Sequence, residues 1–446
     1  MCGIVGSLGN NNANNESILE MANTIKNRGP DDFGVWSDIK NNIFLGHRRL
    51  SILDLTSNGH QPMISKSGRY IIVFNGEIYN HIEIRNNYFN DYEWNGYSDT
   101  ETLLAAFEKW GIEHSLKFLV GMFSFAVWDR YEESLNLVRD RFGEKPLFYY
   151  KGDEGIVFAS ELKAINFLLN KSLEINDESL AVFLCLSYIP SPLSIFKNVF
   201  KLEPGHFLKF TKSKDPVSKT YWSLEEKYFS AKKSMFKGSD KEAINILENL
   251  LKNTLKNQTI SHVPLGSFLS GGIDSSLVTS LLQSESSRPI KTFTIGFDSE
   301  EFDESLYAKK ISNHLKTDHT EFFVTSNDAL NIIPSLQKIY DEPFADSSQI
   351  PTIIVSKLAK KKVTVALSGD GADELFAGYN RYIFTEKIWR TLNKVPLKIR
   401  RSCSKFLSTI PSPIIENILN TSNNFLPITS QFSYPMNKYS KILDIL

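Results

Sequence analysis

Two glycines separate an apolar run from a helical one in the stretch Phe268-Leu269-Ser270-Gly271-Gly272-Ile273-Asp274-Ser275-Ser276. Apolar residues run in from Val263, and leucine and valine follow at helical spacing after Ser276. This pattern predicts a strand, a tight loop and a helix. Such a loop directs successive backbone N–H groups and a helix N-terminus at one point, which suits an anion. No Gly-Lys-Ser/Thr follows the glycines, so it is not a Walker loop. The alternative is an ordinary strand–helix turn capped by Ser and Asp.

Cys2 is the second candidate for chemistry. Met1 precedes a small residue, so its removal leaves a cysteine that carries both a thiol and the chain's free α-amino group. An α-amino group titrates near roughly 7.7–8.0, close enough to neutrality to act as a general base. Thiolate nucleophile and base then lie on one residue. The alternative is a frayed terminus with an incidental cysteine.

The composition is that of a globular chain. Its 446 residues predict two or three domains, and 41% hydrophobic with 23% charged residues can bury a substantial core. Fifty basic residues against 51 acidic ones give no reason to expect a nucleic acid or an anionic membrane as partner. No apolar run reaches the roughly 18 residues of a membrane helix, and the N-terminus lacks the basic region of a signal peptide. Three cysteines do not support a disulfide scaffold, so we expect a cytoplasmic protein.

The first half must position Cys2. We expect a helix over Ile18–Ile25, and strands over the apolar stretches Gly3–Leu8, Tyr70–Phe74, Met122–Trp128 and Ser134–Val138. Ser98 followed by Glu101 three residues on predicts the N-cap of a helix that runs to Trp110. Asn75-Gly76 lies directly after a strand, where the pair is also the commonest hairpin signal.

The second half must position the glycine loop. A helix is expected over Ile244–Leu255, and strands over Val263–Leu269, Lys291–Phe297, His319–Val324 and Val363–Leu367. Strands that alternate with helices indicate a parallel sheet flanked by helices. Between the halves, the stretch from Lys212 to Gly238 is charged, low in aliphatics and broken by Pro216, which predicts a linker.

The first half resembles the class II glutamine amidotransferase domain, an N-terminal-nucleophile fold of two stacked sheets between helices. The resemblance spans Cys2 to about Gly205 and is carried, in order, by Cys2-Gly3-Ile4-Val5-Gly6, Arg28-Gly29-Pro30-Asp31, Asn75-Gly76-Glu77 and Ser98-Asp99.

The resemblance implies a role for each matching residue. Cys2 would be the nucleophile, and the Asn75 side chain with the Gly76 N–H would be the oxyanion donors. Arg49 would bind the α-carboxylate of glutamine, and Glu77 and Asp99 its α-ammonium. Arg48 adjoins Arg49, and the sequence does not decide which arginine faces the site.

The second half resembles the asparagine synthetases. Ser270 to Ser276 is similar to the pyrophosphate loop Ser-Gly-Gly-x-Asp-Ser of enzymes that split ATP between its α and β phosphates. Ser368-Gly369-Asp370-Gly371-Ala372-Asp373-Glu374-Leu375-Phe376-Ala377-Gly378-Tyr379 and the loop Asp341–Pro351 match the same family. A divalent cation must mediate between carboxylates and a polyanion such as ATP.

This second resemblance also implies residue roles. Asp274 and Asp373 would be Mg²⁺ ligands, although two capped helix starts would be the alternative for these acids. Asp370 stands at the position of the family's catalytic acid, which is glutamate in some members. The nucleotide would lie on Phe268, Ser270, Gly271, Gly272, Asp274, Ser275, Ser276, Ile295, Ser368 and Gly369.

Together the two resemblances predict a glutaminase domain over 2–210, a linker over 211–238 and a C-terminally shortened synthetase domain over 239–446. Glutamine, aspartate and ATP with Mg²⁺ would give asparagine, AMP and pyrophosphate. The alternatives are amidation of another acid, such as a sugar uronate, or a paralogue that retains only glutaminase or nucleotide binding.

The C-terminal end departs from the family. Full synthetases continue through a helical region with a Lys-x-Asp-Arg motif, and residues 387–446 contain none. We therefore expect glutaminase activity with weak or absent synthetase activity. The apolar pattern from Tyr439 to Leu446 favours self-association, as in a homodimer, or a partner that supplies the missing part.

Overall fold

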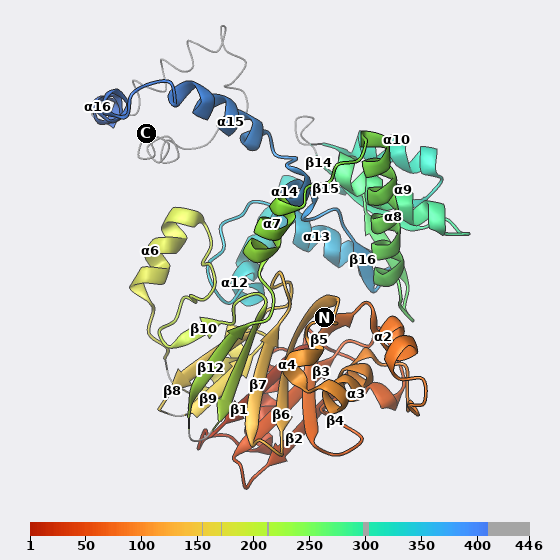
Figure 1. Ribbon diagram of the computed structural model, residues 1–446, viewed down its shortest axis with the longest axis vertical. Helices are drawn as coiled ribbons and strands as arrows, with labels where there is room; N and C mark the ends of the chain where they lie inside the picture. Colours follow the sequence, from red (N-terminus) through yellow and green to blue (C-terminus); the bar gives the residue numbers. More distant parts are fainter. Residues whose placement is uncertain (154, 171, 212–213, 298–302, 409–446) are drawn as a thin grey trace. The chain divides into compact units, whose positions relative to one another are not determined.

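The computed structural model describes residues 1–153, 155–170, 172–211, 214–297 and 303–408 (Figure 1). It divides into two compact units, Met1–Gly369 and Asp370–Leu446. The apolar pattern over Tyr439–Leu446, on which self-association was predicted, lies outside the described residues.

Two six-stranded antiparallel sheets form the N-terminal part of the first unit. The first sheet has the order β10-β8-β9-β1-β3-β2, built from β1 (Gly3–Leu8), β2 (Asp32–Asp38), β3 (Ile43–Arg49), β8 (Phe148–Gly152), β9 (Gly155–Ala159) and β10 (Val199–Lys201). The second has the order β12-β11-β7-β6-β5-β4, built from β4 (Met63–Ile64), β5 (Tyr70–Ile78), β6 (Gly121–Asp129), β7 (Ser134–Arg139), β11 (His206–Thr211) and β12 (Lys214–Thr220).

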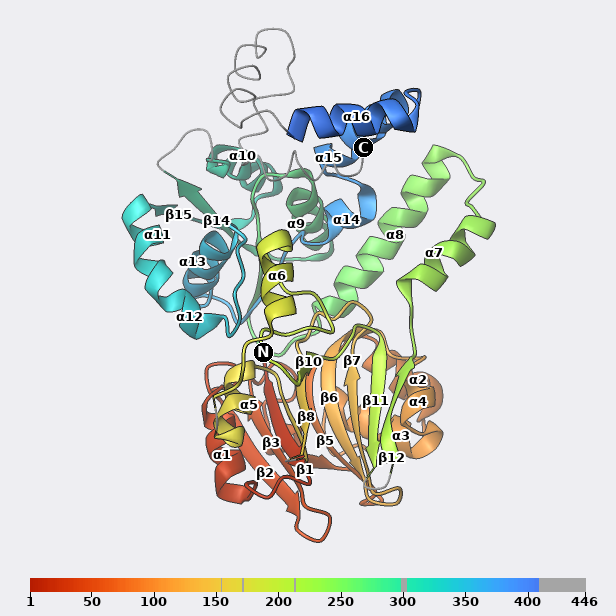
Figure 2. The same ribbon diagram turned by 90° about the vertical axis from the view of Figure 1, so that its left-hand side faces the viewer.

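Helices cover the outer face of each sheet (Figure 2). The first sheet is covered by α1 (Asn15–Asn23) and α5 (Leu162–Leu169), and the second by α2 (His81–Tyr88), α3 (Asp99–Trp110) and α4 (Ile112–Ser115). Between the sheets lies a fully buried core that includes Ile4 and Leu45 from one sheet and Val73 and Trp128 from the other. The predicted sandwich of two sheets between helices is therefore confirmed.

Strand β5 continues straight through Asn75-Gly76, so the hairpin alternative for this pair is wrong. A Cβ on Gly76 would lie 2.2 Å from the Met122 carbonyl oxygen, and the neighbouring strand therefore requires glycine here. Ser98 caps α3 as predicted, because its side chain accepts from the Thr100 N–H. Glu101 accepts instead from the backbone of the preceding loop, at Asn95 and Gly96.

The predicted linker contains regular structure. Strand β12 pairs with β11 and so extends the second sheet into this stretch. Helix α7 (Leu224–Lys233) follows, and α8 (Asp240–Gln258) begins with a capping box in which the Ser239 and Glu242 side chains each bind the other's backbone N–H. The charged composition marked a solvent-exposed edge strand and helix rather than an irregular connection.

A four-stranded parallel sheet forms the rest of the first unit, in the order β15-β14-β13-β16. Its strands are β13 (Leu265–Phe268), β14 (Lys291–Phe297), β15 (Asp318–Val324) and β16 (Val365–Leu367). Its helices include α9 (Ile273–Glu285), α10 (Ser305–Leu315), α11 (Ser326–Ile332), α12 (Leu336–Ile339) and α13 (Gln349–Ala359). The predicted parallel α/β sheet is confirmed. One further helix of this unit, α6 (Asp177–Leu186), precedes β10.

The described part of the second unit is helical. It contains α14 (Ala372–Phe376), α15 (Asn380–Leu392) and α16 (Leu397–Ser408). Among the described residues of both units, no helix combines the length and apolar character needed to cross a bilayer.

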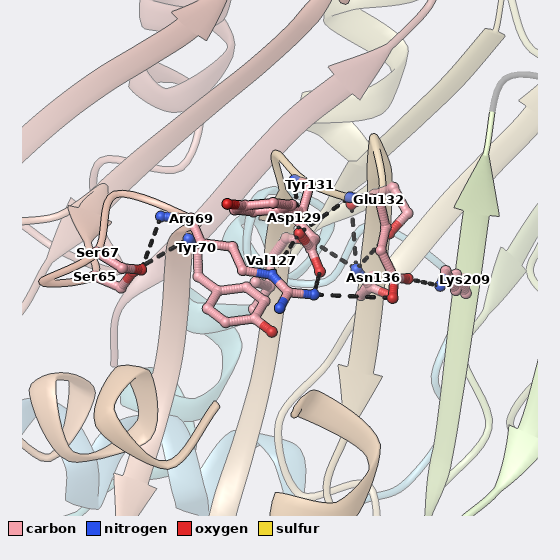
Figure 3. A network of polar contacts seen from close by, with 11 residues as sticks. Ser65, Ser67, Arg69, Tyr70, Val127, Asp129, Tyr131, Glu132, Asn136 and Lys209 are labelled. Atoms are coloured by element: carbon pink, nitrogen blue, oxygen red, sulfur yellow. Dashed lines mark hydrogen bonds and ion pairs between the residues drawn. The ribbon is translucent and has the colours of Figure 1, made fainter. Parts of the chain in front are cut away.

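A dense polar network holds the beginning of β5 against β6 and β7 (Figure 3). The Arg69 guanidinium binds both carboxylate oxygens of Asp129, at 3.0 and 2.7 Å. The same carboxylate accepts from the backbone N–H groups of Tyr131 and Glu132 in the β6–β7 turn. Asn136 donates to carbonyls on both sides of that turn. These contacts give partners to the buried Asp129 carboxylate and Asn136 amide at this end of the second sheet.

Candidate active sites

Cys2 stands directly before β1, where Gly3 pairs with Arg48. Its Sγ accepts from the Leu50 N–H at 3.4 Å. Its carbonyl accepts from Arg28 Nε at 2.9 Å, and the same guanidinium binds Glu161 at 3.0 Å. The residue is therefore fixed at both its backbone and its sulfur, which excludes the frayed terminus.

The surroundings of Cys2 act on two titrating groups. Burial raises the pKa of the Cys2 thiol, while the Leu50 N–H and the Arg49 charge lower it. Burial also lowers the pKa of the α-amino group on Met1 to about 6, and the Arg28 and Lys145 charges add to that effect. The α-amino group of Met1 is therefore mostly neutral at pH 7. Lys145 was not predicted as a site residue, although the stretch that contains it, Arg139–Pro146, follows a predicted strand.

The two arginines at the end of β3 point in opposite directions, as neighbours on a strand do. Arg48 binds the Asn23 side chain on α1 and lies over the Phe33 ring. Arg49 donates to the carbonyls of Leu53, Asp54 and Thr56 and acts on the Cys2 thiol. Arg49 is therefore the arginine that faces the Cys2 site.

Asn75 is fully buried, and neither the oxygen nor the nitrogen of its side chain has a hydrogen-bond partner. A buried amide without partners costs about 1–3 kcal/mol. Asn75 therefore presents a free donor and a free acceptor on β5. It directly precedes Gly76, whose N–H was predicted to be the second oxyanion donor.

Glu77 and Asp99 form a buried pair of carboxylates beside Asn75. Asp99 accepts from the Ile78 N–H at 2.8 Å, which ties the start of α3 to β5. Burial raises the pKa of Asp99 to about 6. Burial, followed by the Asp99 charge, raises the pKa of Glu77. Two carboxylates that resist ionisation together suit a cationic ligand.

The glycine loop joins β13 to α9 as predicted. Gly271 has φ +88°, and a Cβ there would lie 2.8 Å from atoms of Tyr307 and Ala308. Ser270 and Ser275 close the loop through their hydroxyls, 3.0 Å apart. The N-cap of α9 is Gly272, which offers no side-chain oxygen, so the first-turn N–H groups of α9 have no capping acceptor.

The neighbouring strands bring further predicted residues to the same sheet edge. β14 and β16 flank β13 in parallel. Ile295 lies on β14 two residues beyond its last pair with β13, and Ser368 directly follows β16. A Cβ on Gly369 would lie 2.8 Å from the Ser275 nitrogen and 3.0 Å from Asp274. Phe268, the loop and the segment after β16 therefore meet in one place, where open parallel sheets bind ligands.

Asp370 and Asp373 belong to the second unit, so their position relative to Asp274 is not described. Within that unit Asp373 lies in the first turn of α14, and a Cβ on Gly378 would lie 2.0 Å from its Oδ1. The N-cap of α14 is Gly371 without a side-chain hydrogen bond, so Asp373 does not cap this helix. Among the described residues, no group of three or more His, Cys, Asp and Glu is arranged to hold a metal.

The loop 341–351 makes ion pairs inside the first unit. Asp341 accepts from the Lys163 N–H at 2.8 Å and pairs with its ammonium at 3.2 Å. Glu342 pairs with Lys201 and accepts from the Ile195 N–H at 3.3 Å. The acids at the start of this loop therefore have lysine partners and are not available to a ligand.

Comparison with known proteins agrees with both halves of the chain. A family model described as a glutamine amidotransferase domain matches residues 1–222, and one described as asparagine synthase matches residues 247–427. A putative glutamine-hydrolysing asparagine synthetase 2 of Methanocaldococcus jannaschii is 37% identical over 96% of this chain and 83% of its own length. Asparagine synthetase 1 of Bacillus subtilis is 37% identical over 86% of this chain and 59% of its own length.

A putative asparagine synthetase of Mycobacterium tuberculosis is 33% identical over 92% of this chain and 65% of its own length. The chain thus spans most of the archaeal relative and less than two thirds of the two bacterial ones. Because the archaeal match covers most of both chains and the two family models match both halves, the chain belongs to the glutamine-hydrolysing asparagine synthetase family.

Proposed function

We propose that the chain is a glutamine-dependent asparagine synthetase, which releases ammonia from glutamine at Cys2 and uses it to amidate aspartate at the expense of ATP. One observation carries the first half of this proposal. The half-buried Cys2 thiol, the inward Arg49, the unpartnered Asn75 amide and the paired acids Glu77 and Asp99 lie around the same end of β5.

In the glutaminase step the Cys2 thiol gives its proton to the free α-amino group, and the resulting thiolate attacks the side-chain amide carbon of glutamine. The α-ammonium group then gives that proton to the leaving nitrogen. The departing ammonia leaves a γ-glutamyl thioester, which water then hydrolyses to glutamate. Asn75 Nδ2 and the Gly76 N–H would hold the oxyanion, since each such donor lowers the barrier by about 3–4 kcal/mol. Arg49 would bind the α-carboxylate, and Glu77 with Asp99 the α-ammonium.

In the synthetase step the β-carboxylate of aspartate attacks the α-phosphorus of ATP and pyrophosphate leaves. Ammonia then attacks the acyl carbon of the adenylate, and AMP leaves. The uncapped first turn of α9 and the Gly271-Gly272 loop would hold the departing pyrophosphate. Ile295, Ser368 and Gly369 would line the nucleotide, and Asp370 would take the family's acid position.

The Asp274 carboxylate, in the first turn of α9, fits a Mg²⁺ ion that is bound mainly by phosphates. Magnesium is usually held by one or two carboxylates together with substrate phosphates and water, so a cluster of three protein acids is not needed. Mg²⁺ at this point would offset the phosphate charge. Asp373 stays the proposed second ligand.

Aspartate is the acceptor that the family favours over a sugar uronate. The cytoplasm and the homodimer stay predictions. The first rests on cysteine usage in the sequence.

The proposal is tested with the full chain, glutamine or ammonia, aspartate, ATP and Mg²⁺. The expected stoichiometry is one AMP and one pyrophosphate for each asparagine formed, whatever the rate. Asp274→Asn should lower AMP release by orders of magnitude and leave glutamine hydrolysis unchanged. ADP formed in proportion to product, or AMP formed with a uronate but not with aspartate, would contradict the assignment.

A further inference from the structure

Strand β5 loses its outer partner just before the oxyanion residues. β4 pairs only with Ile71 and Ile72, so the edge of β5 beyond them has no strand to bind. Two side chains take its place at Phe74. Gln61 Oε1 accepts from the Phe74 N–H at 2.7 Å, and His47 Nε2 lies 3.0 Å from the Phe74 carbonyl oxygen. On this outer edge the Phe74 N–H and carbonyl are thus held by side chains, while the inner edge of β5 pairs with β6.

The His47 contact fixes the tautomer of its ring. A carbonyl oxygen only accepts, so His47 must donate from a protonated Nε2. The ring is fully buried, its Nδ1 has no partner, and burial lowers the pKa of His47 to about 4. His47 is therefore a neutral donor throughout the pH range in which an enzyme of this kind works.

The same hydrogen bond joins the two sheets. His47 lies on β3 in the first sheet, where it pairs with Ile4, two residues after the nucleophile. Phe74 lies on β5 in the second sheet, one residue before Asn75. The nucleophile and the oxyanion donors come from different sheets, so their separation depends on contacts of this kind.

Gln61 extends the arrangement to the other side of the site. Its Nε2 donates to the Thr100 hydroxyl at 3.3 Å, and Thr100 follows Asp99 in the first turn of α3. Because the Asn75 side chain has no partner of its own, its position is set by the β5 backbone, which β6 holds on one edge and His47 and Gln61 hold on the other.

We propose that His47 and Gln61 are positioning residues for glutamine hydrolysis, which fix the Asn75-Gly76 oxyanion donors of one sheet relative to Cys2 in the other. This inference rests on the proposed glutaminase function. Neither side chain touches the substrate. Both act through the Phe74 peptide.

The test uses four variants of the full chain. His47→Leu removes the donor, and His47→Gln retains an N–H at a similar reach. Gln61→Met removes the acceptor for the Phe74 N–H at similar volume. His81→Leu is the matched control, since His81 is equally buried and both of its ring nitrogens lack partners.

We expect His47→Leu and Gln61→Met to lower kcat for glutamine hydrolysis by about 10²-fold, the effect of displacing a catalytic group by about an ångström. KM for glutamine and the rate of Cys2 alkylation by iodoacetamide should stay near the wild-type values. His47→Gln should restore most of kcat, and His81→Leu should leave it unchanged.

Wild-type kcat in both His47→Leu and Gln61→Met would overturn the inference. A loss of kcat that His47→Gln does not restore, together with parallel changes in KM and in the alkylation rate, would also overturn it. A structural defect alone produces that pattern. If His47→Leu does not fold, Gln61→Met decides. A wild-type chain that hydrolyses no glutamine while Cys2 alkylates normally would overturn the proposed function itself.

Discussion

The two ends of strand β5 carry buried polar groups that are treated in opposite ways. At the Tyr70 end, the Asp129 carboxylate on the neighbouring strand β6 accepts two hydrogen bonds from the Arg69 guanidinium and two from backbone N–H groups (Figure 3). At the other end, Asn75 is fully buried with no side-chain partner.

This difference separates polar groups with a structural role from those proposed to bind a ligand at the two ends of one strand. An unsatisfied buried group costs about 1–3 kcal/mol, and at Asn75 both the donor and the acceptor of one amide lack a partner. The acids beside Asn75 show the same cost, since burial raises the pKa of Asp99 to about 6. On the proposed function, the beginning of β5 stabilises the sheet, and the end of β5 provides the glutamine site at the expense of stability.

The largest effect is expected for Cys2→Ala. It should reduce glutamine-dependent activity to background and leave any ammonia-dependent asparagine synthesis intact, because the phosphate loop lies on a separate sheet. Both nitrogen sources are assayed together, with Cys185→Ala on α6 as the control for a lost thiol. Equal loss with both sources would contradict two separate sites.

Asn75→Ala should come next, with a fall in kcat of about 10²–10³-fold from the loss of one oxyanion donor. Since the Asn75 amide has no hydrogen-bond partner in the native protein, the thermal midpoint of Asn75→Ala should not fall below that of the wild type. Glutaminase kinetics and calorimetry on the same preparation check both statements. A destabilised variant with normal kcat would show that Asn75 is a structural residue.

Asp129→Ala should give the reverse of the Asn75→Ala result, with lower stability and unchanged kcat. It leaves Arg69 and two turn N–H groups without their acceptor, and we expect a loss of about 2–3 kcal/mol in the free energy of unfolding. Urea denaturation measures the loss, and kcat at a temperature where the variant is folded should match the wild type. A large fall in kcat of the folded Asp129→Ala variant would contradict the distinction between the structural end and the functional end of β5.

The smallest effect is the pH dependence that Asp99 produces. Binding of the glutamine α-ammonium requires ionised Asp99, so KM for glutamine should rise as pH falls below about 6. Asp99→Asn should have a higher KM that does not change with pH. The folded-state pKa is raised, so the stability that Asp99 contributes is full below pH 3.8 and is lost as pH rises to about 6. The difference in unfolding free energy between wild type and Asp99→Asn should follow that curve. A difference independent of pH would contradict the raised pKa.

The sequence predicted the elements that local pattern controls. β1 has the predicted bounds, Ser98 caps α3, and the glycine loop joins a strand to a helix. Motif spacing also selected the residues that the fold brings around Cys2. The hairpin alternative at Asn75-Gly76 failed because a neighbouring strand, β6, pairs across both residues.

Contacts between distant segments could not be predicted in this way. Whether Arg48 or Arg49 faces Cys2 depends on the face of β3 that α1 covers, which no local signal records. Arg28 on the Cys2 carbonyl, and His47 and Gln61 on Phe74, have partners 26, 27 and 13 residues away. Strand β12 was missed because an exposed edge strand has the polar composition of a linker.

Detection of the covalent intermediate tests the central claim most directly. The full chain is mixed with glutamine, quenched in acid within the first turnover, and its peptides are measured by mass spectrometry. We predict a γ-glutamyl group on Cys2, at a chain end from which Met1 has been removed, and no such group in Cys2→Ala. Glutamate release without a Cys2 adduct, or an adduct on Cys185 instead, would contradict the claim that the partnerless polar groups at the end of β5 surround the nucleophile for glutamine.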